Sequence, residues 1–100
     1  MVIYNVTVAV DKAIEPEWVH WMKTEHMDEV LATGYFSEYR LFRILPQEDE
    51  HVVSYAVQYL ADSIFAVNQY FQTSAPALRQ KSQEKFGDKQ VAFRTLLEAV

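Results

Sequence analysis

The apolar residues of this chain switch repeatedly between a spacing of two and a spacing of three to four, and the order of these switches limits the possible folds. Residues 2–10 alternate along the chain and are rich in β-branched side chains, which predicts a strand. From Glu17 to Thr33 the apolar spacing is helical. Pro16 suits the start of such a helix and Gly34 its end. The chain therefore opens with a strand and a helix.

Two further strands and a second helix follow. Residues 36–45 and 51–60 are rich in aromatic and aliphatic side chains, and the acidic stretch between them predicts a hairpin loop. Asp62 or Ser63 can cap the next helix. Pro76 is expected to break that helix, because a proline ring clashes with the preceding turn.

Residues 91–97 predict a last strand, so the order of elements is β-α-β-β-α-β. This order is typical of the ferredoxin-like α+β fold, a four-stranded antiparallel sheet with its helices on one face. One hundred residues suit a single domain, 1–100.

The sheet face without helices needs cover of its own. A large apolar face is costly to leave in water, so we expect a homodimer in which two sheets close over each other as a dimeric α/β barrel. The residues assigned to this face are Tyr4, Val6, Val8, Tyr55, Val57, Tyr59, Val91, Phe93 and Leu97.

Composition limits which binding partners and which cellular compartment are expected. The net charge of −5 disfavours non-specific binding to nucleic acid or to an anionic membrane. The chain has no cysteine, which excludes disulfides and zinc–thiolate sites and fits a cytoplasmic protein. The chain has no run of about 18 apolar residues, so no membrane-spanning helix is predicted.

Several segments carry specific patterns: Tyr4–Val8 with Asp11, Trp18–His26, Val30–Phe36, Arg43–Leu45, Tyr55–Tyr59 and Phe93–Glu98. Together they resemble a small bacterial family known as domain of unknown function 4286, over nearly the whole chain. The resemblance implies a relation to the dimeric α/β-barrel proteins, which include monooxygenases, isomerases, haem-degrading enzymes and ligand binders. It selects none of these activities, because function belongs to the site and not to the scaffold.

His26 is the candidate catalytic residue. It shares a helical stripe with Met22 and Val30, so it is expected to face the sheet. Burial lowers the pKa of a histidine, whereas a neighbouring carboxylate such as Glu29 raises it. A neutral buried imidazole can act as general base, hydrogen-bonding group or metal ligand. The alternative is a core histidine bonded to a backbone carbonyl or a tyrosine hydroxyl.

A second group of polar residues is expected on the strands, beneath the helices and close to His26. One cation among neutral polar groups suits a small carboxylate or a quinone-like ligand. Under the alternative, these side chains are buried and only satisfy one another's hydrogen-bonding groups. Arg40 is as good a candidate for this group as Arg43, because the register of their strand is ambiguous. The predicted ligand-binding residues are Asn5, Thr7, Arg43, Gln58 and Arg94, with Ser54 beside them.

Other sites are disfavoured. Trp18 and Trp21 suit packing better than ligand stacking. His20 and His26 are too far round a helix to chelate one ion, and His51 lies in the acidic loop, so no metal site is predicted. Two glycines are too few for a phosphate-binding loop, and no cofactor is expected.

The sequence therefore favours a protein that binds a small, anionic or aromatic metabolite between sheet and helices. One alternative is a cofactor-independent monooxygenase or isomerase that uses His26. The other is an interaction or regulatory module without chemistry.

Overall fold

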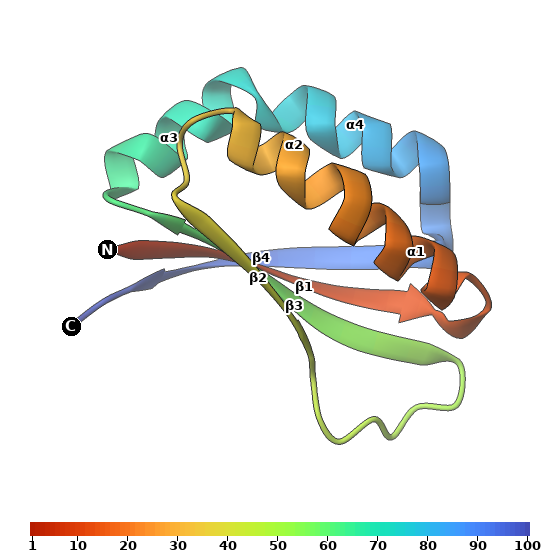
Figure 1. The fold of residues 1–100 in the computed structure, drawn as a ribbon. Helices are drawn as coiled ribbons and strands as arrows, with labels where there is room; N and C mark the ends of the chain where they lie inside the picture. Colours follow the sequence, from red (N-terminus) through yellow and green to blue (C-terminus); the bar gives the residue numbers. More distant parts are fainter.

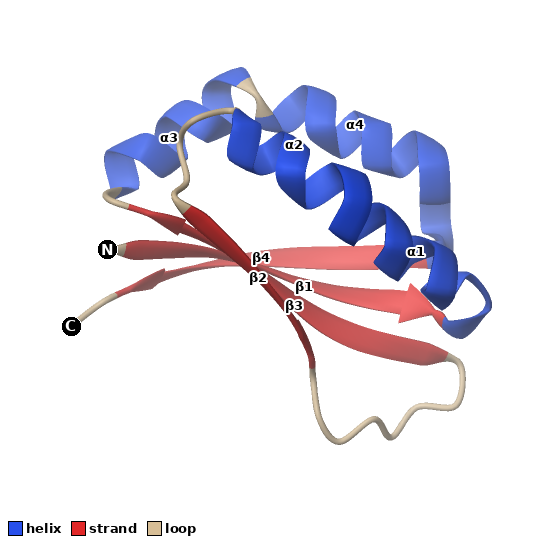
Figure 2. Cartoon of the chain, viewed as in Figure 1, coloured by secondary structure: helices blue, strands red, loops and turns tan.

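The computed structural model describes residues 1–100, and it contains a four-stranded sheet with all its helices on one side (Figures 1 and 2). The predicted order of strands and helices is confirmed. The elements are β1 (Val2–Asp11), α1 (Glu15–Trp21), α2 (Met27–Ala32), β2 (Glu38–Arg43), β3 (Val52–Ala61), α3 (Ile64–Thr73), α4 (Ala75–Phe86) and β4 (Gln90–Glu98).

The sheet has the strand order β2-β3-β1-β4, and every neighbouring pair is antiparallel. This topology is the ferredoxin-like fold that the sequence predicts. In the register of β1 with β3, Val6 lies opposite Val57. On the other side of β1, Val6 lies opposite Arg94 of β4. These two pairings decide which side chains share a face.

The helices end and turn where the sequence predicts. Gly34 follows the first helix with a φ of 87°, a backbone conformation that favours glycine. Ser63 caps α3 by accepting a hydrogen bond from the backbone N–H of Ala66 at 3.3 Å. Near Pro76 the helical segment divides into α3 and α4, and the proline lies in the first turn of α4. The predicted break is therefore confirmed.

The first helix contains one irregular turn. Between α1 and α2, residues Met22–His26 form a π-helical turn. The backbone continues as helix on both sides, so the segment from Glu15 to Ala32 crosses the sheet as one rod. A π turn inserts a residue into the helical repeat, and such turns occur frequently at functional sites. This turn contains the candidate residue His26.

The covered face of the sheet is not the one that the sequence reasoning assigned. The even-numbered residues of β1, with Tyr55, Val57 and Tyr59 of β3, face the helices and form the core. The expectation that they face a second sheet is therefore wrong. It failed because the helices need the most continuous apolar face, and these residues provide it. Val91, Phe93 and Leu97 do lie on the uncovered face, where they are exposed.

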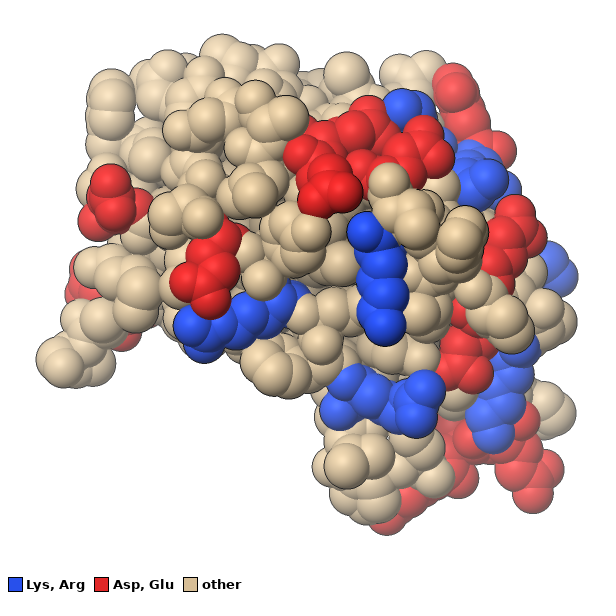
Figure 3. Space-filling view, viewed as in Figure 1, with Lys and Arg blue, Asp and Glu red and all other residues tan.

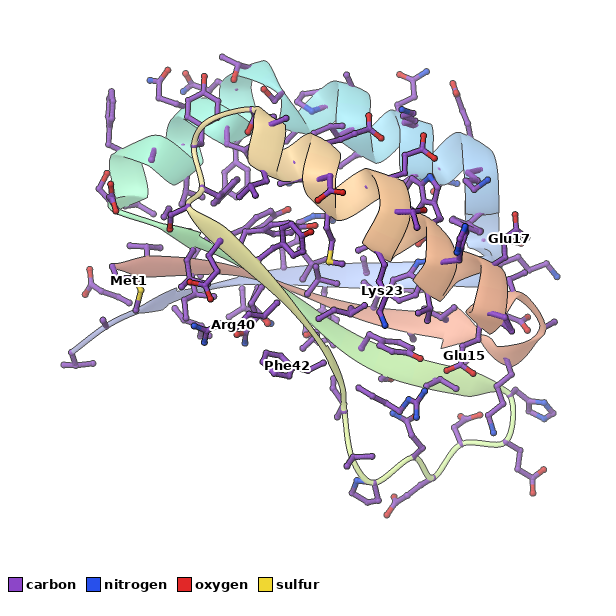
Figure 4. All side chains as sticks on the ribbon, in the orientation of Figure 1. Met1, Glu15, Glu17, Lys23, Arg40 and Phe42 are labelled. Atoms are coloured by element: carbon purple, nitrogen blue, oxygen red, sulfur yellow. The ribbon has the colours of Figure 1, made fainter.

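We call this uncovered face the bare face. Figure 4 shows Phe42 and Arg40 of β2 on it, pointing away from the helices. Phe93 is 63% exposed there and Phe42 48%. No helix of the structure is long and apolar enough to span a membrane.

Candidate functional site

A cavity of about 540 Å³ lies between the helices and the covered face of the sheet. Eleven of its eighteen lining residues are hydrophobic, and they come from the strands β1, β3 and β4 and from every helix. Its volume falls within the range of roughly 300–1,000 Å³ that small-molecule sites occupy. The polar residues that line it are His26, Arg79, Gln80, Ser82, Gln83, Gln90 and Arg94.

His26 lines this cavity from the π turn, as the sequence predicts for the sheet-facing stripe. Its ring stacks on Trp21, with centroids 4.6 Å apart and planes 20° apart. Burial lowers the pKa of His26 to about 4; the carboxylates of Glu29 and Glu25 oppose this shift, and Lys81 adds to it. The imidazole is therefore neutral at pH 7. Its Nδ1 atom is buried without a hydrogen-bond partner.

An ion-paired group lies beside His26. Lys81 of α4 bonds to Glu29 at 2.8 Å and lies 3.4 Å from Glu25. The second carboxylate oxygen of Glu29, Oε1, is buried and has no partner. Two unpartnered polar atoms, one on His26 and one on Glu29, thus lie in the same part of the helical layer. Unpaired buried polar atoms are unusual in folded proteins.

Three hydrogen-bonded residues from distant parts of the chain, Trp18, Gln90 and Ser82, form another side of the cavity. The indole Nε1 of Trp18 donates to Oε1 of Gln90 at 2.9 Å. Gln90 in turn donates to the hydroxyl of Ser82 at 2.6 Å. Sequence reasoning missed Gln90, because it lies outside the predicted last strand. It assigned Trp18 to packing, and Trp18 is indeed only 1% exposed.

Three of the predicted ligand-binding residues lie on the bare face, away from the cavity. Gln58 donates to Asn5 at 3.3 Å, and Asn5 donates to Thr7 at 3.3 Å, so they form a polar row across β3 and β1. Ser54 lies on the same face. The expectation that these side chains lie beneath the helices with His26 is wrong. Its cause is the exchange of the two faces described above.

The two arginines of β2 lie on opposite faces of the sheet. Arg43 lies on the covered side but outside the cavity lining, where it bonds to the Tyr55 hydroxyl at 3.4 Å and lies 3.8 Å from Glu15. Arg40 lies on the bare face and pairs with Glu38 at 2.8 Å. Neither arginine reaches the cavity.

Arg94 does line the cavity, and it does not stand alone. Its Nε donates to the Tyr4 hydroxyl at 3.0 Å. Arg79 of α4 donates to the same hydroxyl at 3.4 Å. Sequence reasoning missed Arg79 and the role of Tyr4. The alternation of β1 could have found Tyr4 once its face was known, whereas Arg79 depends on how α4 packs over β4.

Charges on the visible face of the molecule are mixed in sign. Figure 3 shows Lys and Arg interspersed with Asp and Glu over α1, α2 and the hairpin, whereas the surface over α3 carries almost no charge. No group of three or more His, Asp or Glu side chains is placed to hold a metal ion.

The fold and the site together define a ferredoxin-like α+β domain with a mostly apolar cavity between its two layers. The chain belongs to the family DUF4286, a domain of unknown function, whose model matches residues 1–100. None of the curated proteins matches its sequence. A solved structure, that of an EthD (ethyl tert-butyl ether degradation) family protein from Bacillus halodurans, has the same fold with a TM-score of 0.69. That protein is 13% identical, and the match covers 100% of both chains.

Proposed function

We propose that this protein binds a small, mostly apolar metabolite in the cavity between sheet and helices. The observation that carries the proposal is the cavity itself, about 540 Å³ in a chain of 100 residues. Well-packed interiors of domains this small leave few voids larger than a water molecule. A cavity with an apolar lining and a few convergent polar groups is instead typical of a ligand site.

The bound state is tested first by native mass spectrometry of the purified protein, where a discrete extra mass would identify an occupant. A neutral fluorescent probe, N-phenyl-1-naphthylamine, then measures cavity binding directly. Ala92 lines the cavity, so Ala92→Phe should weaken probe binding at least about tenfold by filling the space. Ala77→Phe makes the same change at an exposed position of α4 outside the lining and should leave binding unchanged. Equal binding by both variants would contradict the proposal.

His26 supports isomerisation as a second candidate. His26 lines the cavity and its imidazole is neutral, so the ring can take a proton from one carbon of the ligand and return it to another, and this requires no further reactant. The experiment is proton exchange into the identified ligand from deuterated water, followed by NMR. His26→Gln keeps a polar side chain but removes the base, so exchange should stop while binding persists. Exchange at an unchanged rate would rule out His26 as the base.

We further propose that two copies pair through the bare face. Exposed apolar side chains of β2 and β4 surround the polar row there. The charged residues on this face of β2, Glu38 and Arg40, neutralise each other, so β2 adds no net charge to the face. The fold shared with dimeric α/β-barrel proteins supports the same arrangement. A homodimer would cover both bare faces at once.

A further inference from the structure

Two arginine side chains converge on one oxygen atom at the edge of the cavity. Arg94 comes from β4 and Arg79 from α4, and both donate to the hydroxyl of Tyr4. Both residues line the cavity, and both are exposed. Like charges held this close repel each other, and the neutral hydroxyl between them offsets only part of that repulsion. An anion placed between them would remove it.

No carboxylate of the chain neutralises this pair. The other two arginines, Arg40 and Arg43, each have an acidic partner within 4 Å. Arg79 and Arg94 have none, although the chain carries fourteen acidic residues and a net charge of −5. The cavity lining contains no Asp or Glu at all. A local positive site in an acidic protein therefore opens onto an apolar cavity.

The surrounding aromatic residues hold the two arginines in place. Tyr4 is 3% exposed, and its ring packs edge-on against Phe71 with centroids 5.2 Å apart. The guanidinium of Arg79 lies over the face of Phe71, 5.5 Å from its centroid. Burial raises the pKa of Tyr70, and the charges of Arg79 and Arg94 act against this shift. The positive field of both arginines thus reaches into the aromatic core.

We propose that Arg79, Arg94 and Tyr4 form a clamp for the carboxylate of an otherwise apolar ligand. This inference rests on the proposed function and adds the chemical class of the ligand. Guanidinium groups match the two oxygens of a carboxylate, and the Tyr4 hydroxyl can donate a further hydrogen bond. Neither glycine lies in the lining, so the cavity has no glycine-rich turn of the kind that binds phosphate through backbone N–H groups.

The position of the clamp also limits the shape of the ligand. Arg94 and Gln90 lie on the same face of β4, four residues apart, which corresponds to roughly 13 Å along a strand. The small side chain of Ala92 lies between them and lines the cavity. An acid group at Arg94 therefore leaves an apolar body beside Ala92, directed toward the Gln90–Trp18 pair. A flat aromatic or short aliphatic acid fits this description.

The test compares 2-naphthoate with its neutral counterpart 2-naphthamide by isothermal titration calorimetry. Wild-type protein should bind the acid more tightly than the amide, and rising salt should weaken only the acid. Arg79→Gln and Arg94→Gln should each weaken binding of the acid about tenfold and leave the amide unchanged. Lys85→Gln removes the same charge from α4 outside the cavity and should change neither affinity. Melting temperatures confirm that each variant is folded.

The outcomes separate this inference from the proposed function. If acid and amide bind equally well, and the arginine variants change neither, the clamp is wrong while cavity binding stands. If neither probe binds the wild type and N-phenyl-1-naphthylamine also fails to bind, the proposed function is wrong and the clamp with it. Arg94→Lys sharpens the result, because it keeps the charge and loses the planar fork. An affinity for the acid between those of wild type and Arg94→Gln supports bidentate recognition.

Discussion

The two faces of the sheet are built from neighbouring residues of the same strands, yet they distribute polarity in opposite ways. The covered face is aromatic and aliphatic throughout its centre, and its polar groups lie on the edge strands, Arg94 and Gln90 on β4 and Arg43 on β2. The bare face has its polar row in the centre, on β1 and β3, with exposed apolar side chains on the outer strands. Under the two proposals above, one face encloses a ligand and the other meets a second sheet.

The largest difference between the faces should appear when a charge is placed on each. Val8 and Thr7 are adjacent on β1; Val8 is 5% exposed on the covered face, and Thr7 lies on the bare face. Val8→Asp should cost about 4 kcal/mol or more and prevent stable folding, because it buries an unpaired carboxyl in a domain of only about 5–15 kcal/mol stability. Thr7→Asp should leave a folded protein. Urea unfolding followed by circular dichroism measures both, and similar losses would erase the distinction.

The sequence predicts the order of elements because each element carries its own local signal. Gly34 and Pro76 mark helix ends through backbone geometry, and the helical stripe correctly places His26 toward the sheet. Which face of the sheet is covered is a property of packing. Alternation along β1 separates Tyr4 from Asn5 but does not say which of them meets the helices.

The candidate site illustrates the same limit in β4. Arg94 was grouped with Asn5 and Thr7, but the register places it opposite Val6, on the covered face. Strand register depends on hydrogen-bonded pairing between distant segments, so alternation within one strand cannot supply it. The position of Arg79 is harder still to predict from the sequence, because α4 is mostly polar and shows no clear apolar stripe. The clamp exists only once α4 lies over β4.

The second prediction tests the bare face as an interface. Phe93 on β4 is 63% exposed and Phe65 on α3 is 69% exposed, so they form a matched pair. Phe93→Asp should raise the dimer dissociation constant at least about a hundredfold, because it places a charge in an apolar contact on both copies. Phe65→Asp should leave the dimer intact. Sedimentation velocity at micromolar concentration measures both. A monomeric wild type, or a dimer that survives Phe93→Asp, would contradict pairing through this face.

The third prediction uses pH to probe the covered face. The pKa of His26 is about 4 in the folded protein, below its ordinary value of 6.5. As pH falls from about 6.5 to about 4, the unfolded chain takes up a proton that the folded chain does not, so stability falls across this window. Wild type should lose roughly 3 kcal/mol more than His26→Gln. Glu25, Glu29 and Lys81 are present in both proteins, so the difference isolates the imidazole.

Urea unfolding at pH 4.0, 5.0, 6.0 and 7.0 supplies the measurement, and an NMR titration of the His26 ring provides an independent value of the pKa. Parallel stability curves for the two proteins would mean that the imidazole is not desolvated. The ring would then titrate near its ordinary pKa, and a neutral base in the cavity at low pH would be ruled out. The bare face carries no histidine, so it offers no counterpart to this imidazole.

The smallest expected effect compares one glutamine on each face. Gln90→Met on the covered side removes the acceptor for the buried Trp18 indole and should cost about 1–3 kcal/mol, the penalty of an unsatisfied buried donor. Gln58→Met on the bare face removes one long hydrogen bond to the half-buried Asn5, so it should cost less than about 1 kcal/mol. Urea unfolding gives both values. Equal costs would indicate that the bare face is also sealed from water, as it would be in a dimer. Repeating the measurement in the Phe93→Asp background tests whether a dimer seals the face. If it does, the cost of Gln58→Met should fall below that of Gln90→Met once the dimer is disrupted.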